Sequence, residues 1–238
     1  MSYDPLKNIL GNEKEITYEE CQKLWEDENT LVHHDTSERL IREVTDHIIK
    51  ICELNHEDIL LNIGCGDGLF DTRILSAVKC YYGVDFSEQK LTIARKNVPE
   101  GRYFQHNFLN PYCDEIRDAG ITKIYSYSVV QYCKPEDVER FIYNQLCLCT
   151  EEREYLIAHL DVPDRSKAVN YYKKRYPDLT DDNDCSSVKT LFGDGSYWHD
   201  MQSFENAASK FGLECRIYPA NYWDYRSDIV LRFKGKKW

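Results

Sequence analysis

From Asn55 onward, short apolar runs alternate with longer stretches in which apolar residues recur at helical spacing. Several of the runs are apolar enough to be strands buried on both faces. Strands that alternate with amphipathic helices are typical of a mainly parallel sheet, because each helix carries the chain back to the start of the next strand. The strands expected from this pattern are Ile59–Ile63, Cys80–Val84, Arg102–Gln105, Lys123–Ser128 and Glu154–Leu160.

The last part of the chain has a different order of elements. A helical stretch is closed by Gly212, and two strand candidates follow it at Glu214–Tyr218 and Asp228–Phe233. Two consecutive strands predict an antiparallel hairpin at the edge of the sheet. We therefore expect an α/β fold with a doubly wound, mainly parallel seven-stranded sheet and an antiparallel C-terminal hairpin. The helices expected around these strands are Leu69–Ala77, Glu88–Asn97, Glu136–Cys149 and Gln202–Phe211.

Two segments interrupt this alternation. Residues 1–55 contain helical stretches at Tyr18–Glu28 and Ser37–Leu54, and residues 161–200 are polar, aromatic and weakly periodic. Long segments of this kind in a compact domain are typical of lids and binding loops. We interpret residues 1–55 as an N-terminal helical lid and residues 56–238 as one domain, with a substrate-side insertion at about 161–200.

Composition excludes some classes of function. The formal net charge of −11 provides no broad basic surface for a nucleic acid. The 10 cysteines form no CxxC pair, which favours reduced, buried thiols over a metal site or disulfides. The chain has neither an apolar run long enough to span a membrane nor the pattern of a secretion signal, so we expect a cytoplasmic protein. The sequence leaves the oligomeric state open.

A glycine-rich turn follows the first strand of the predicted sheet. The strand Ile59–Ile63 leads directly into Gly64, Gly66 and Gly68, and a helix follows. Glycines allow a tight turn and let a ligand approach the backbone, while the N–H groups at the helix start face that ligand. A simple tight turn is the alternative interpretation.

An acidic residue ends the next strand. Asp85 lies about 20 residues after the glycine turn, where a carboxylate accepts hydrogen bonds from both hydroxyls of a ribose. A helix cap just before Ser87 is the alternative role for this carboxylate. Together with the glycines, Asp85 indicates a cofactor that contains adenosine.

The glycine spacing resembles one family in particular. Dinucleotide enzymes carry GxGxxG, whereas this turn reads GxGxG and resembles motif I of class I S-adenosylmethionine-dependent methyltransferases. The resemblance covers about residues 35–160 and implies S-adenosyl-L-methionine as cofactor. It departs from the family pattern at Asn62 and Asn107, where the family usually carries acidic residues, although an Asn carbonyl still accepts a hydrogen bond. The cofactor-binding residues that it implies are Asn62, Gly64, Cys65, Gly66, Asp67, Gly68, Asp85, Phe86, Asn107, Phe108, Ser126 and Tyr127.

The segment after the fourth strand bears on the methyl acceptor. Tyr125–Tyr132 resembles motif IV of the family, but its part Ser126–Val129 lacks the two prolines of the adenine and cytosine amino-methyltransferases. We interpret the chain as a small-molecule enzyme that O-methylates an anionic or sugar-derived metabolite in a biosynthetic pathway. A non-catalytic, cofactor-binding regulatory protein and a methyltransferase of protein or tRNA are the alternatives.

Candidate proton acceptors come from three places. His33 and His34 follow the first helical stretch, His159 and Asp161 end the fifth strand, and His199 ends the insertion. Asp161, His34 and His199 are favoured among them. Histidine titrates near neutral pH, and the carboxyl ends of parallel strands are where ligands bind in open α/β sheets. No metal site is expected. Cations and aromatic residues of the insertion could hold an anionic acceptor or form a solvated helix face: Arg165, Lys167, Tyr171, Tyr172, Lys173, Lys174, Arg175, Tyr197 and Trp198.

Overall fold

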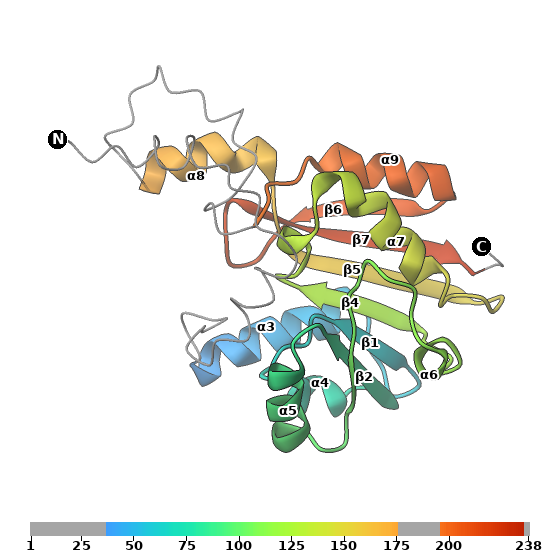
Figure 1. Ribbon diagram of the computed structural model, residues 1–238. Helices are drawn as coiled ribbons and strands as arrows, with labels where there is room; N and C mark the ends of the chain where they lie inside the picture. Colours follow the sequence, from blue (N-terminus) through green and yellow to red (C-terminus); the bar gives the residue numbers. More distant parts are fainter. Residues whose placement is uncertain (1–36, 176–195, 236–238) are drawn as a thin grey trace.

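The computed structural model describes residues 37–175 and 196–235, and it confirms the expected sheet (Figure 1). Seven strands lie in the order β3-β2-β1-β4-β5-β7-β6. The first five are parallel, and β7 runs antiparallel to both β5 and β6. The strands are β1 Ile59–Ile63, β2 Cys80–Asp85, β3 Arg102–Gln105, β4 Lys123–Tyr127, β5 Glu154–Pro163, β6 Glu214–Pro219 and β7 Arg226–Lys234.

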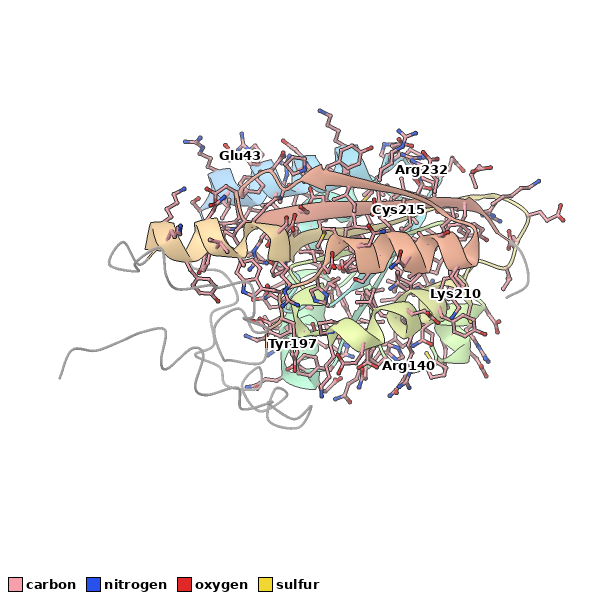
Figure 2. The ribbon with its side chains drawn as sticks, turned by 90° about the horizontal axis from the view of Figure 1, so that it is seen from above. Glu43, Arg140, Tyr197, Lys210, Cys215 and Arg232 are labelled. Atoms are coloured by element: carbon pink, nitrogen blue, oxygen red, sulfur yellow. The ribbon has the colours of Figure 1, made fainter. Side chains whose placement is uncertain are left out.

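Helices cover both faces of this sheet. They are α3 Glu38–Ile51, α4 Asp71–Leu75, α5 Glu88–Asn97, α6 Asp114–Arg117, α7 Val138–Leu146, α8 Ala168–Arg175 and α9 Met201–Phe211. Seen from above, α3 lies on one side of the sheet and α7 on the other (Figure 2). None of the helices in the described part of the chain combines the length and apolarity needed to cross a bilayer.

The core is divided between these two faces. Leu60 and Leu61 are neighbours in β1 and fully buried, yet their side chains join different core clusters. Successive side chains of a strand point to opposite faces, so each cluster belongs to one face. Leu60 packs with residues of α3, α4 and α5, whereas Leu61 packs with residues of α6, α7 and α9.

Part of the segment interpreted as a lid is a helix of the core. Ser37 caps α3 by accepting a hydrogen bond from the backbone N–H of Leu40 at 3.3 Å. Val44 and Ile48 of α3 are buried in the cluster that contains Leu60. The other stretch expected there, Tyr18–Glu28, lies outside the described residues.

The start of the segment expected to be irregular is regular. β5 continues through Asp161 to Pro163, beyond its expected end at Leu160, and α8 follows. The polar residues at this end of β5 interrupt the apolar pattern of the sequence. In the structure Asp161 is buried, and its backbone N donates a hydrogen bond to Asp228 Oδ1 of β7 at 2.8 Å. The pairing of β5 with β7 is irregular between His159 and Val162, and Asp161 has a φ of +61°. The prediction of an irregular segment from residue 161 is therefore wrong for this part, and residues 176–195 lie outside the description.

Candidate functional site

The glycine turn after β1 is held on one side and open on the other. Gly64 has a φ of +73°, and a Cβ at this position would overlap the side chain of Val129. Gly66 has a φ of +57°, and apart from its own and the two neighbouring residues no described part of the chain lies within 4 Å of where its Cβ would be. Only glycine tolerates both the left-handed backbone conformation and the close packing found at Gly64. The turn is thus pressed against the segment after β4 at Gly64 and leaves free space at Gly66.

Asp85, at the end of β2, fixes this turn from the neighbouring strand. Its Oδ2 accepts a hydrogen bond from Gly66 N, and its Oδ1 accepts one from Ser87 N, both at 2.9 Å. Burial raises the pKa of Asp85, while these two N–H donors and the ammonium of Lys90 lower it. The carboxylate therefore ties the glycine turn to the start of α5, and the helix cap itself is Ser87, which accepts from Lys90 N.

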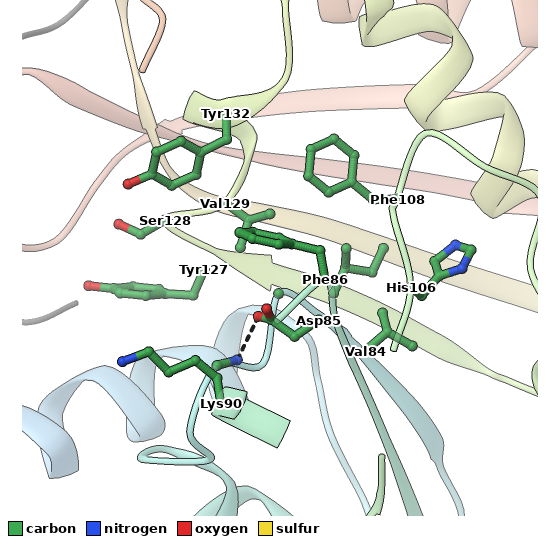
Figure 3. Close-up of a pocket in the computed structure, with 13 residues that line it drawn as sticks. Val84, Asp85, Phe86, Lys90, His106, Phe108, Tyr127, Ser128, Val129 and Tyr132 are labelled. Carbon is green, nitrogen blue, oxygen red and sulfur yellow. Dashed lines mark hydrogen bonds between the residues drawn. The ribbon is translucent and has the colours of Figure 1, made fainter. Parts of the chain in front are cut away.

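A pocket opens beside Gly66 and Asp85 (Figure 3). Its empty space, including the open mouth, is about 620 Å³, a size that suits a nucleoside-containing ligand. Figure 3 shows Val84, His106 and Phe108 on one side, whereas the side-chain oxygens of Tyr127, Ser128 and Tyr132 and the Lys90 ammonium point to the other. The pocket is lined by Ile63, Gly64, Gly66, Val84, Asp85, Phe86, Lys90, His106, Phe108, Tyr127, Ser128, Val129 and Tyr132. We call the side with the three hydroxyls and the ammonium the polar edge.

The structure separates the twelve cofactor residues expected from the sequence into two groups. Gly64, Gly66, Asp85, Phe86, Phe108 and Tyr127 line the pocket. Asn62, Cys65, Asp67, Gly68, Asn107 and Ser126 do not. In the second group, Asp67 and Asn107 accept hydrogen bonds from N–H groups two residues further on, so their side chains shape the local turns. Ser126 is buried, and its Oγ lies 3.0 Å from His159 Nδ1.

Asn62 lies behind the glycine turn and contacts a carboxylate that the sequence did not reveal. Its Nδ2 donates to Tyr81 Oη at 2.8 Å and lies 3.4 Å from Asp71 Oδ1. Tyr103 Oη donates to the other oxygen of Asp71 at 3.0 Å. Burial raises the pKa of Asp71 to about 6, against the effect of these donors. Asp71 and Asn62 thus belong to a buried polar cluster that lies behind the glycine turn.

Several pocket residues were not among those expected to bind the cofactor. His106, Ser128 and Tyr132 lie in the motif segments that the sequence singles out, but their neighbours were favoured. Lys90 is different, because nothing in those motifs points to it. The sequence feature that could have pointed to Lys90 is helical spacing. Lys90 and Ala94 are four residues apart on the buried face of α5, where a lysine is unusual.

Of the three favoured proton acceptors, Asp161 lies next to the pocket. Ser128, at the polar edge, donates a hydrogen bond from Oγ to Asp161 Oδ2. Arg226 Nη1 lies 3.1 Å from the same oxygen and also donates to Gln131 Oε1 at 2.7 Å. Burial raises the pKa of Asp161, and Arg226 and Ser128 lower it. Asp161 therefore touches the pocket through Ser128.

The other two candidates are not at the pocket in the described structure. His199 is fully buried, with Nε2 2.9 Å from Val130 O, and it does not line the pocket. Burial lowers the pKa of His199 to about 4, so the ring is neutral at neutral pH. His34 lies outside the described residues. Two cations of the insertion are neutralised locally, since Lys167 Nζ lies 3.3 Å from Asp164 and Lys174 Nζ 2.8 Å from Asp224.

Comparison with known proteins identifies this arrangement. Residues 60–149, which contain the glycine turn, Asp85 and the polar edge, match the family model of the methyltransferase domain. The chain is an S-adenosylmethionine-dependent methyltransferase that carries this domain at residues 60–149. S-adenosyl-L-methionine is its cofactor. No curated protein matches the methyltransferase in sequence.

Solved structures of methyltransferases share its fold at low sequence identity. Magnesium protoporphyrin IX methyltransferase from Synechocystis PCC 6803, with bound S-adenosylmethionine, has a TM-score of 0.54 and 12% identity and covers 99% of each chain. Geranyl diphosphate C-methyltransferase from Streptomyces coelicolor A3(2) has a TM-score of 0.59 and 11% identity and covers 91% of this chain and 97% of its own. N-methyltransferase NodS from Bradyrhizobium japonicum WM9 has a TM-score of 0.54 and 11% identity, with 85% and 99% covered.

Proposed function

We propose that this methyltransferase transfers a methyl group to a hydroxyl oxygen of a small molecule, an anionic or sugar-derived metabolite of a biosynthetic pathway. The observation that carries the proposal is the contact between Ser128, at the polar edge of the pocket, and the buried carboxylate of Asp161. A weakly acidic hydroxyl must lose its proton during methyl transfer, and this pair can accept one.

The pocket fits the cofactor at three points. Gly66 has open space where other residues would have a Cβ, so a ligand can approach the backbone. Asp85 accepts two N–H hydrogen bonds, and its remaining lone pairs suit ribose hydroxyls. Phe86, His106 and Phe108 supply ring surfaces for a base. When bound, S-adenosylmethionine supplies the electrophilic methyl group.

During methyl transfer, the proton of the hydroxyl that is methylated passes to two side chains of the enzyme in turn. Ser128 Oγ takes the proton of the acceptor hydroxyl and gives its own proton to Asp161 Oδ2. Burial raises the pKa of Asp161, which makes its carboxylate a stronger base than an exposed one. Arg226 holds this carboxylate in place through contacts of its Nη1 with both the side chain and the carbonyl oxygen of Asp161.

A small acceptor suits both the charge of the protein and the shape of its pocket. The net charge of −11 disfavours a nucleic acid, and the empty space of about 620 Å³, open mouth included, lies in the size range of small-molecule sites. Two of the structural relatives are named for small molecules, magnesium protoporphyrin IX and geranyl diphosphate. These names support the size class of the acceptor rather than its identity.

Substitution of Ser128 tests the proton path. Ser128 has a φ of +57°, which glycine adopts without strain, so Ser128→Gly removes the hydroxyl and leaves the backbone conformation relaxed. We expect formation of S-adenosylhomocysteine, measured across a panel of hydroxylated anionic metabolites, to fall about 100-fold or more. Calorimetry should show unchanged affinity for S-adenosylhomocysteine.

Tyr132→Phe is the matched control, since it removes a different hydroxyl of the polar edge. Full activity of Ser128→Gly on the identified acceptor would rule out the proton path. Silence of the wild-type enzyme across the whole panel, with the cofactor bound, would favour a regulatory protein instead.

A further inference from the structure

Lys90 occupies a buried position of a helix, where lysines are rare. It lies in the first turn of α5, and its backbone N–H is fixed by the cap, Ser87. The residue is only 8% exposed, and it lies on the same face as the buried residues Leu91 and Ala94. Lysine is almost never buried to this extent unless a negative charge compensates for the lost hydration. The sequence therefore places a buried charge among the residues that line the pocket.

Lys90 supplies the positive charge of this pocket. Among the residues that line it, Asp85 is the acidic one, and Lys90 is the one with an ammonium group. The remaining basic group is His106, whose pKa is lowered by burial, so that its ring is neutral. The ammonium lowers the pKa of Asp85, although less than the backbone N–H donors of that carboxylate do.

The ammonium lies at the polar edge rather than at the aromatic side. Figure 3 shows the Lys90 side chain extending from α5 towards the same side as the hydroxyl of Tyr127, away from His106 and Phe108. Tyr127 is itself partly buried, and burial raises its pKa, so its hydroxyl stays protonated and can donate. An ammonium and hydroxyl donors at one edge of a partly enclosed pocket form an arrangement that recognises a carboxylate or a phosphate.

We propose that Lys90 binds an anionic oxygen group of a pocket ligand, a carboxylate or a phosphate, with Tyr127 beside it. Two ligands of this enzyme can bring such a group. The cofactor carries the α-carboxylate of its amino-acid part, and the anionic acceptor of the proposed function carries its own charge. The first source rests on the cofactor alone, and the second rests on the proposed function.

A purely structural role makes a different prediction. If Lys90 serves only to balance Asp85, its loss affects the ribose contact of Asp85 and weakens every adenosine ligand equally. If Lys90 binds an anion, its loss weakens only ligands that carry that anion. A pair of ligands that share adenosine but differ in the carboxylate therefore separates the two roles.

The first arm of the test uses calorimetry with S-adenosylhomocysteine and with 5′-deoxy-5′-methylthioadenosine, which lacks the amino-acid part. Lys90→Met keeps the length of the side chain and removes its charge, Lys90→Arg keeps the charge, and Lys96→Met is the control on the exposed face of the same helix. For a cofactor carboxylate, Lys90→Met should lower affinity for S-adenosylhomocysteine about 10- to 100-fold and leave that for methylthioadenosine unchanged. Lys90→Arg should retain most of the affinity.

The second arm addresses the acceptor. Pyrophosphate and citrate are titrated into wild-type and Lys90→Met protein, each saturated with S-adenosylhomocysteine. Binding that is present in the wild type and lost in Lys90→Met, with the first arm unchanged, assigns the anion to the acceptor. Equal loss for both adenosine ligands, or no dependence on Lys90 in either arm, overturns the proposal. Either result leaves the Ser128→Gly test of O-methylation intact, because that test measures activity rather than anion binding.

Discussion

At the scale of single residues, the site depends on backbone conformations that the sequence does not reveal. Ser128 and Asp161 both have positive φ values although neither is glycine, and they are joined by a hydrogen bond. Such conformations cost about 1–3 kcal/mol each and persist where surrounding structure holds them. Here Arg226 does so, because its Nη1 reaches both residues.

Two glycines of the turn should respond differently to the same substitution. In Gly64→Ala the new methyl group overlaps Val129, so we expect the free energy of unfolding to fall by about 2–4 kcal/mol in urea. In Gly66→Ala the methyl group enters open space, so stability should fall by only about 1 kcal/mol, from backbone strain. Calorimetry should instead show a loss of S-adenosylhomocysteine affinity for Gly66→Ala. Equal stability losses for the two variants would contradict this division.

The carboxylate at the end of β2 gives a further prediction. Asp85→Ala removes an acceptor that holds Gly66 and Ser87 and that suits ribose hydroxyls. A hydrogen bond to a charged group contributes about 1.5–3 kcal/mol, so affinity for S-adenosylhomocysteine should fall about 10- to 100-fold. Isothermal titration of wild type and variant measures this directly, and equal affinities would remove the ribose assignment.

At the scale of elements, α3 shows how a helix outside the alternating pattern still belongs to the core. Ile48 is fully buried between α3 and the sheet. Ile48→Ala should lower the free energy of unfolding by about 2–5 kcal/mol, since the cavity is closed off by well-packed neighbours. Lys50→Ala, at an exposed position of the same helix, should change it by less than about 0.5 kcal/mol. A small effect of Ile48→Ala in urea titrations would mean that α3 is only loosely attached.

The accuracy of the sequence-based prediction differs between elements for physical reasons. β1, β2 and β4 are short, mostly apolar runs, and β3 is a short run with two aromatic residues at its centre. The expected positions of all four agree with the structure to within a residue. The end of β5 was missed because its polar residue Asp161 finds partners on β7, a strand that is remote in sequence. The glycine turn and Asp85 were found because their spacing is local. Asp71 and Lys90 were missed because a buried charge carries no signal in apolar periodicity.

At the scale of the whole molecule, buried ionisable groups set the response to acid. Burial lowers the pKa of His159 to about 3 and that of His199 to about 4, below the ordinary value of 6.5. Their contribution to stability is present above pH 6.5 and is lost as the pH falls towards these values. Asp71 acts in the opposite direction: its pKa is raised to about 6, so its contribution is present below pH 3.8 and is lost as the pH rises through 6.

The buried histidines and the buried carboxylates Asp71, Asp85 and Asp161 therefore act in opposite directions as the pH falls from 6.5 to 4, and single substitutions separate their contributions. His199→Gln removes one of the groups that take up protons on unfolding while leaving an amide that can donate to Val130 O. Compared with the wild type, the free energy of unfolding of this variant in urea should change towards higher stability as the pH falls from 6.5 to 4, and that of Asp71→Asn towards lower stability. A change of His199→Gln in the opposite direction would contradict the assignment.

The position of β7 in the sheet has a consequence for how the enzyme is made. This strand is reached late in the chain, yet it lies between β5 and β6 and brings Arg226 and Asp228 to Asp161. While the polypeptide is still emerging from the ribosome, β5 remains an unpaired edge that is open to association with other nascent chains. The contacts of Asp161 with Arg226 and Asp228 therefore form only after β7 has been synthesised, and a product interrupted between β5 and β7 would lack both partners of this carboxylate.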